Sequence, residues 1–88
     1  MSRATFQCDQ SAWLSAANEM EQLARRLPDG PQRITAFHRD MRLSAQPDDY
    51  LARSEAIEGD VVVLRTAPGP KAEAFLADLR AAVEGVKA

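Results

Sequence analysis

The fold of this chain is decided by one stretch of sequence, Asp60-Val61-Val62-Val63-Leu64-Arg65-Thr66. It is the only run of consecutive β-branched and leucine side chains in the sequence. Turn-forming residues bound it at Glu58-Gly59 and at 67–70. A short, continuous apolar run between turn residues predicts a buried β-strand. We therefore expect this valine stretch to be a strand around which the rest of the chain is arranged.

The segment just before it, Tyr50 to Ile57, has two interpretations. It contains good helix formers and is followed by Gly59, which could cap a helix C-terminus. As a strand, it would instead form a hairpin with the valine stretch across a turn at Glu58-Gly59. We favour the hairpin, because an isolated helix of about nine residues is marginal and the valine stretch needs a pairing partner.

Two segments, about 10–27 and 70–84, carry apolar residues at helical spacing. Asp9 is placed to cap the first helix, and a proline- and glycine-containing turn at 28–31 ends it. Pro70 occupies the first position of the second helix, and Gly85 can end it. The first apolar stripe contains Trp13, Ala16, Ala17, Met20, Leu23, Ala24 and Leu27; the second contains Ala72, Phe75, Leu76, Leu79, Val83 and Val86.

Residues 32–43 alternate in character, with Thr35, Phe37, Met41 and Leu43 at odd positions. A period of two predicts a strand whose odd positions face inward, and residues 5–6 are a candidate for a short edge strand. The element order becomes (β)-α-β-β-β-α. We expect a single α+β domain over residues 1–88, a two-layer sandwich with two helices packed on one face of an antiparallel sheet of three to four strands.

One face of this sheet would remain apolar after the core is formed. In the hairpin, Leu51, Ile57, Val62 and Leu64 fall on the face opposite the one that the helices cover. An uncovered face is normally polar, and contiguous exposed apolar surface marks an interaction site. We expect these four residues to form an interface, most simply in a homodimer. The predicted core consists of Trp13, Met20, Leu23, Phe37, Val61, Val63, Phe75, Leu76 and Leu79.

Candidate chemistry is sparse. His38, Asp40 and Arg42 would share one face of the predicted strand at 32–43, and His38, Arg39 and Arg42 are the candidates for binding an anion or ligand. An exposed, solvated face is the simpler interpretation. One histidine and one cysteine, Cys8, do not make a metal site. No phosphate loop, nucleophile elbow or dinucleotide motif is present, so we expect neither a metal nor a cofactor.

Charge is segregated along the chain, although the net charge is only −2. The segment 25–42 holds five arginines, whereas 48–60 is acidic. The two segments could neutralise each other in the fold, or the arginines could form a basic patch. A mildly acidic chain is not the profile of a general nucleic-acid binder. With no apolar signal segment at the N-terminus, no run long enough to span a bilayer and a single cysteine, we expect a cytoplasmic protein.

These observations predict a small interaction or regulatory module without catalytic activity, acting through the apolar sheet face as a homodimer. Two alternatives remain open. The first is a small enzyme or ligand-binding protein that uses the row of His38, Asp40 and Arg42. The second is a nucleic-acid accessory protein that uses the arginine-rich segment 25–42.

Overall fold

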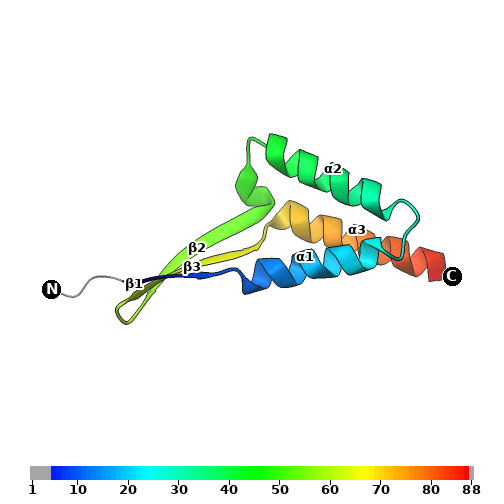
Figure 1. Cartoon of the computed structure of the whole chain (residues 1–88). Helices are drawn as coiled ribbons and strands as arrows, with labels where there is room; N and C mark the ends of the chain where they lie inside the picture. Colours follow the sequence, from blue (N-terminus) through cyan, green and yellow to red (C-terminus); the bar gives the residue numbers. More distant parts are fainter. Residues whose placement is uncertain (1–4, 88) are drawn as a thin grey trace.

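The computed structural model describes residues 5–87 and shows an α+β chain with three helices and one three-stranded sheet (Figure 1). The α+β class is as predicted. The elements follow one another as β1 (Thr5–Asp9), α1 (Ser11–Ala24), α2 (Gly30–Leu43), the 3₁₀ turn η1 (Pro47–Asp49), β2 (Leu51–Glu58), β3 (Val61–Pro68) and α3 (Pro70–Lys87).

The valine stretch forms β3, the central strand of a sheet with the order β1-β3-β2. The hairpin prediction is confirmed, because β2 pairs antiparallel with β3. Its turn lies one residue later than expected, at Gly59-Asp60, so that Glu58 pairs with Val61. Gly59 has a positive φ of 65°, which a glycine adopts without steric cost.

The prediction of a strand at 32–43 is wrong, because this segment lies within helix α2. Pro31 occupies its first turn, where its fixed φ suits a helix. Ile34, Phe37 and Met41 are spaced by three and four residues and pack toward the core, whereas Leu43 is 78 % exposed. The helical spacing of these three side chains therefore outweighs the odd–even alternation.

The sheet is mixed rather than antiparallel, because β1 pairs in parallel with β3. Each of these two strands runs into a helix through a single residue, Gln10 before α1 and Gly69 before α3. The two β–α units consequently extend in the same direction. This arrangement replaces the expected pairing with residues 32–43 and leaves β1 and β2 as the two edges of the sheet.

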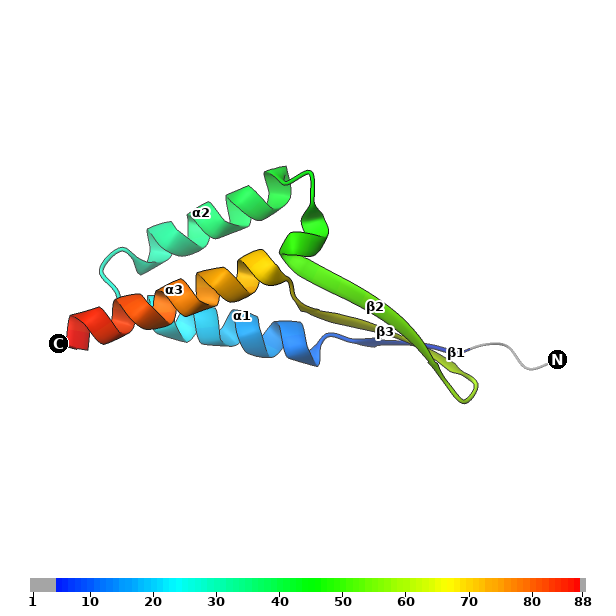
Figure 2. The same ribbon diagram turned by 180° about the vertical axis from the view of Figure 1, so that it is seen from behind.

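The helices continue beyond one end of the sheet instead of lying on its face (Figures 1 and 2). The predicted two-layer sandwich with helices on one face is therefore wrong. The molecule measures 61 × 27 × 17 Å, and its radius of gyration is 16.2 Å. A compact domain of this length has a radius of gyration of about 12 Å. The elongation means that most of the sheet is not covered by the helices.

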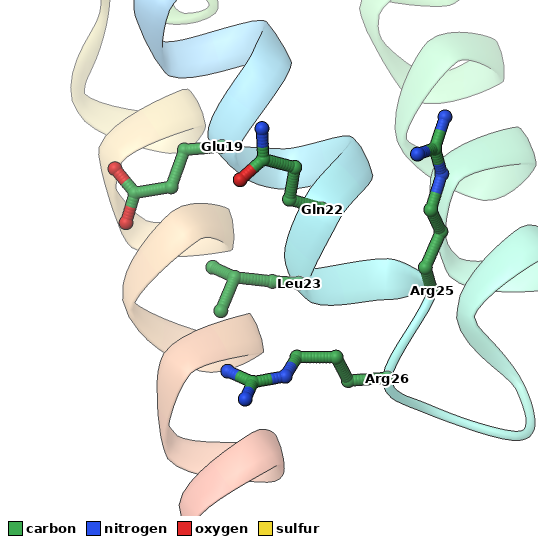
Figure 3. Close-up of a pocket in the computed structure, with 5 residues that line it drawn as sticks. All are labelled: Glu19, Gln22, Leu23, Arg25 and Arg26. Atoms are coloured by element: carbon green, nitrogen blue, oxygen red, sulfur yellow. The ribbon is translucent and has the colours of Figure 1, made fainter.

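An ion pair joins α1 to α3. Arg80 donates hydrogen bonds to both carboxylate oxygens of Glu19, from Nε at 2.7 Å and from the terminal nitrogen at 2.9 Å. Figure 3 shows the Glu19 carboxylate reaching from α1 over the neighbouring helix. These hydrogen bonds, followed by the charge of Arg80, lower the pKa of Glu19 from its ordinary value of 4.5.

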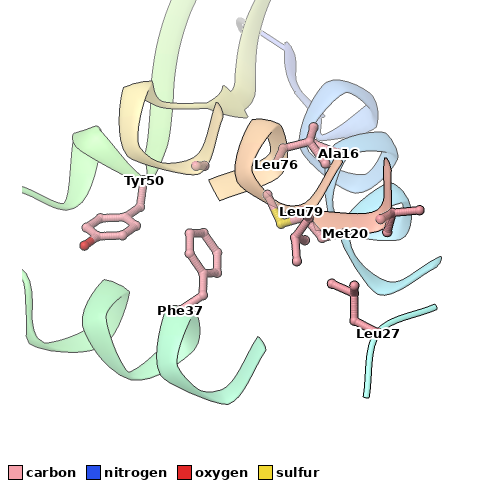
Figure 4. Close-up of a cluster of buried hydrophobic side chains, with 9 residues drawn as sticks. Ala16, Met20, Leu27, Phe37, Tyr50, Leu76 and Leu79 are labelled. Atoms are coloured by element: carbon pink, nitrogen blue, oxygen red, sulfur yellow. The ribbon is translucent and has the colours of Figure 1, made fainter. Parts of the chain in front are cut away.

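The main core lies among the three helices and Tyr50, which follows η1 (Figure 4). Phe37 of α2 stacks on Phe75 of α3, with ring centroids 4.4 Å apart, and Tyr50 closes the same end at 5.6 Å from Phe37. Val63 is buried but lies outside this cluster. Of the predicted core, Met20, Phe37, Val63, Leu76 and Leu79 are buried, whereas Trp13, Leu23, Val61 and Phe75 are only partly so.

Gly69 allows the start of α3 to approach η1 closely. Its backbone N–H donates to the carbonyl oxygen of Tyr50 at 2.9 Å. A methyl group at this position would overlap the carbonyl oxygens of Asp48 and Asp49. A glycine is therefore required here, because two backbone segments are in direct contact. These segments cannot move apart without opening the junction between the sheet and the helices.

We expect Gly69→Ala to lower the free energy of unfolding by about 2 kcal/mol or more, because the added methyl group displaces η1. Gly85→Ala is the matched control. It adds a methyl group to open space within a helix and should raise stability by up to about 1 kcal/mol. Urea denaturation measures both effects, and equal effects would contradict the proposed close approach.

The Glu19–Arg80 ion pair should make stability depend on pH. Because the pKa of Glu19 is lowered in the folded state, its contribution is fully present above the unfolded pKa of about 4.5 and disappears as the pH falls through the folded value. Glu19→Gln should therefore lose less stability between roughly pH 6 and pH 3 than the unmodified protein. Glu21→Gln changes an exposed carboxylate on another side of α1 and should not reduce that acid dependence.

Candidate functional site

One face of the sheet is apolar and exposed. We define the apolar face as Phe6 and Cys8 of β1, Ile57 of β2, and Val62 and Leu64 of β3. Phe6, Val62 and Ile57 are direct neighbours across the three strands and form one row. The Phe6 side chain is 67 % exposed and the Ile57 side chain 77 % exposed. An uninterrupted apolar row therefore crosses the whole width of the sheet in contact with solvent.

The next row of this face continues the apolar surface on β1 and β3. Cys8 lies beside Leu64, which is 37 % exposed, and Glu55 lies on the other side of Leu64. Leu51 is half-buried at the far end of β2, where it pairs with Pro68. The four predicted interface residues thus share one face. The shifted turn changed their pairing by two positions, which does not move a side chain to the other face.

The opposite face of the sheet is polar and carries its own ion pairs. Arg65 contacts Asp9 at 3.4 Å and Glu58 at 3.1 Å. Glu58 lies beside Val61, so the Arg65 side chain reaches along the strand over Val63, which is 3 % exposed. The pKa of Asp9 is lowered chiefly by hydrogen bonds from the Ser11 hydroxyl and amide, with a further contribution from Arg65.

The two faces of the sheet therefore differ in whether their side chains already have partners within the chain. On the polar face, an arginine covers the buried valine and opposite charges are paired. On the apolar face, Phe6 and Ile57 are largely exposed to solvent, as are Arg53 and Glu55 of the same face. The apolar face is consequently the part of the described chain where apolar surface is gathered without a cover.

The proposed row of His38, Asp40 and Arg42 does not exist as a row, because all three lie on helix α2. Successive residues of a helix turn by about 100°, so Asp40 points away from the side that His38 and Arg42 share. All three side chains are exposed. Arg39 is also exposed and contacts Asp40 at 3.5 Å. The structure places these candidates on a solvated helix surface rather than in a concave site.

The grooves on the helical part do not gather these residues either. A groove of about 350 Å³ between α2 and α3 includes Asp40 and Lys71 but neither His38 nor Arg42. A depression of about 300 Å³ on α1 is lined by Glu19 and Arg26 (Figure 3), and Arg80 already binds that glutamate. Among residues 5–87, no group of three or more histidine, cysteine, aspartate or glutamate side chains could hold a metal ion.

The arginine-rich segment is partly neutralised within itself. Arg33 contacts Asp29 at 2.9 Å, one helical turn away, and Arg39 pairs with Asp40. Arg33 and Arg39 thus pair with acids of their own segment and not with the acidic segment 48–60, which was one of the two expected arrangements. In that segment, Asp49 contacts Lys71 and Glu58 contacts Arg65.

Comparison of the chain with protein-family models, with curated proteins and with solved structures found no match. In the described part of the chain, the helices are too short or too polar to cross a membrane. The assignment of function consequently depends on the surface of the molecule.

Sequence reasoning missed Phe6 and Cys8 as members of the site. The signal was the alternation of Thr5, Phe6, Gln7 and Cys8, which places Phe6 and Cys8 on one face of a strand. The sequence could not show that Phe6 and Cys8 lie on the same face as Val62, because the parallel pairing of β1 with β3 joins residues far apart in the sequence. The bridging position of Arg65 had no comparable sequence signal.

We expect His38→Ala to change the free energy of unfolding by less than about 0.5 kcal/mol, because the side chain is exposed and its one described ring contact is an edge contact with Phe37. Phe37→Ala should cost about 3–5 kcal/mol, because it removes a buried ring. Thermal or urea unfolding measures both. A large loss for His38→Ala would contradict this expectation and show that the imidazole supports the fold.

Proposed function

We propose that this protein is a non-catalytic interaction module that self-associates through the apolar face of its sheet. The observation that carries the proposal is the exposed row of Phe6, Val62 and Ile57. In the isolated chain, this apolar row is exposed to water, which is unfavourable. Covering it removes apolar area from water at about 25 cal/mol per Å².

The chain exposes more surface than a compact monomer of its mass. The accessible surface is 6325 Å², whereas a compact monomer of 9.7 kDa exposes about 5,100 Å². The surplus is about 1,200 Å². A standard protein interface buries about 800 Å² on each partner. This surplus belongs to the elongated molecule as a whole, and the sheet that the helices leave uncovered contributes to it.

We assign a second copy of the same chain as the occupant of the apolar face. Two copies related by a twofold axis place the same row on both sides of the contact, so apolar side chains meet apolar side chains. The polar face supports this choice, because Arg65, Asp9 and Glu58 already satisfy one another there. Packing of two sheets face to face, about 10 Å apart, is a common solution for uncovered sheets.

The test is the mass of the assembly in solution. Phe6→Lys and Val62→Lys each place a charge within the proposed contact and should halve the mass measured by sedimentation equilibrium at micromolar concentration. Gln7→Lys is the matched control, because Gln7 neighbours Phe6 on β1 but points to the polar face. An unchanged mass for both variants, or a monomeric unmodified protein, would overturn the proposal.

A further inference from the structure

The outer edge of β2 is a second unpartnered feature of the sheet. β2 is an edge strand, and residues 53–58 along it are exposed. Both views show the hairpin projecting past the helices (Figures 1 and 2). An exposed edge of this length presents backbone N–H and C=O groups that can pair with another strand.

The hydrogen-bond pattern determines which residues present those groups. The amide of Gly69 donates to the carbonyl of Tyr50, so Tyr50 points its backbone groups toward β3. Inward and outward groups alternate along an antiparallel strand. Leu51 therefore points outward, which agrees with its pairing opposite Pro68, a residue without an N–H. By the same alternation, the outward groups of β2 belong to Leu51, Arg53, Glu55 and Ile57.

The sequence of β2 is complementary to itself when read in the opposite direction. The strand reads Leu51-Ala52-Arg53-Ser54-Glu55-Ala56-Ile57. If a second copy pairs antiparallel about an axis through Ser54, leucine lies opposite isoleucine, alanine opposite alanine, and arginine opposite glutamate. Cross-strand pairs of opposite charge and of apolar side chains are the favourable ones in a sheet.

Neighbouring registers are unfavourable. An axis through Arg53 places this arginine opposite itself, and an axis through Glu55 places two glutamates opposite each other. Like charges directly opposite destabilise a sheet. A shift of one residue between the strands would set outward backbone groups against inward ones and remove the hydrogen bonds. Only the register centred on Ser54 combines the ladder with complementary side chains.

Arg53 and Glu55 also lack charged partners of their own. Neither forms an ion pair with any residue that the structure describes. Across the β2–β3 ladder they face Thr66 and Leu64. Pairing about Ser54 would give each of them an opposite charge from the second copy.

We propose that the outer edge of β2 pairs antiparallel with the β2 edge of a second copy, about a twofold axis through Ser54. The product is a six-stranded sheet with the order β1-β3-β2-β2-β3-β1, in which both apolar faces lie on the same side. This contact uses the backbone edge of the sheet, whereas the proposed function uses its apolar face. One axis is perpendicular to the sheet and the other lies parallel to it, so the two contacts together can close a tetramer.

Edge pairing also enlarges the apolar face. The three strands have five, eight and eight residues and together cover about 330 Å² in projection, which is small beside the about 800 Å² per partner of a standard interface. A continuous six-stranded sheet doubles this area. The doubled face carries the Arg53 and Glu55 side chains of the two β2 strands at its centre, and the row of Phe6, Val62 and Ile57 from each copy on either side.

Charge reversal tests the register. Arg53→Glu and Glu55→Arg each replace two attractive pairs by two repulsive ones, and each should weaken edge association by at least about tenfold. The double variant Arg53→Glu/Glu55→Arg restores opposite charges across the axis and should recover the original association. Both positions are exposed and unpaired within the described chain, and circular dichroism verifies that each variant is folded.

Mixing the two single variants gives the sharpest outcome. A chain with two glutamates at these positions complements one with two arginines, so the mixture should form one-to-one hetero-assemblies, seen by native mass spectrometry, more strongly than either variant associates alone. Equal association constants for the unmodified protein, both single variants and the double variant would overturn the edge contact.

Performing the same measurements with Val62→Lys separates the two proposals. If Val62→Lys retains an assembly that responds to the charge reversals, the edge contact stands whatever happens to the face contact. If Val62→Lys halves the mass and the charge reversals have no effect in the unmodified protein, the face contact stands and the edge contact is wrong.

Discussion

A single residue between strand and helix is the constraint on which the rest of this structure depends. Gln10 separates β1 from α1, and Gly69 separates β3 from α3. Connections between strands and helices that pack on a sheet are usually longer, about 2–6 residues. With only one residue available at each junction, the helices extend the strands instead of folding back over them. The core then forms among the helices, and both faces of the sheet remain outside it.

The sequence predicted the elements better than their arrangement. The valine stretch, the hairpin and the two long helices follow from local patterns, and the face shared by Leu51, Ile57, Val62 and Leu64 follows from a period of two that tolerates an error in the turn. Residues 32–43 were misassigned because Phe37 and Met41 satisfy both periods. The parallel partner of β1 is a non-local choice that no short pattern encodes.

The candidate site was predictable to the same extent. Three of its residues, Ile57, Val62 and Leu64, could be named, whereas Phe6 and Cys8 required knowledge of the parallel register. The anion-binding row failed with the strand on which it was based. The contrast between the faces also depends on Arg65, whose side chain crosses Val63 to reach Glu58. Such a contact between strands depends on side-chain packing, and the sequence does not show which acidic residue an arginine will contact.

The separation of the helical core from the sheet divides the stability of the molecule into two unequal units. Leu79, Ala72 and Met20 are buried in the core among the helices, away from the strands. The strands, apart from Val63, have little buried surface of their own and can open as a unit at a lower free-energy cost. Association would stabilise that unit by mass action. Under the proposed association, the stability of the helices would be fixed by the chain itself, whereas the order of the strands would rise and fall with the concentration of the protein.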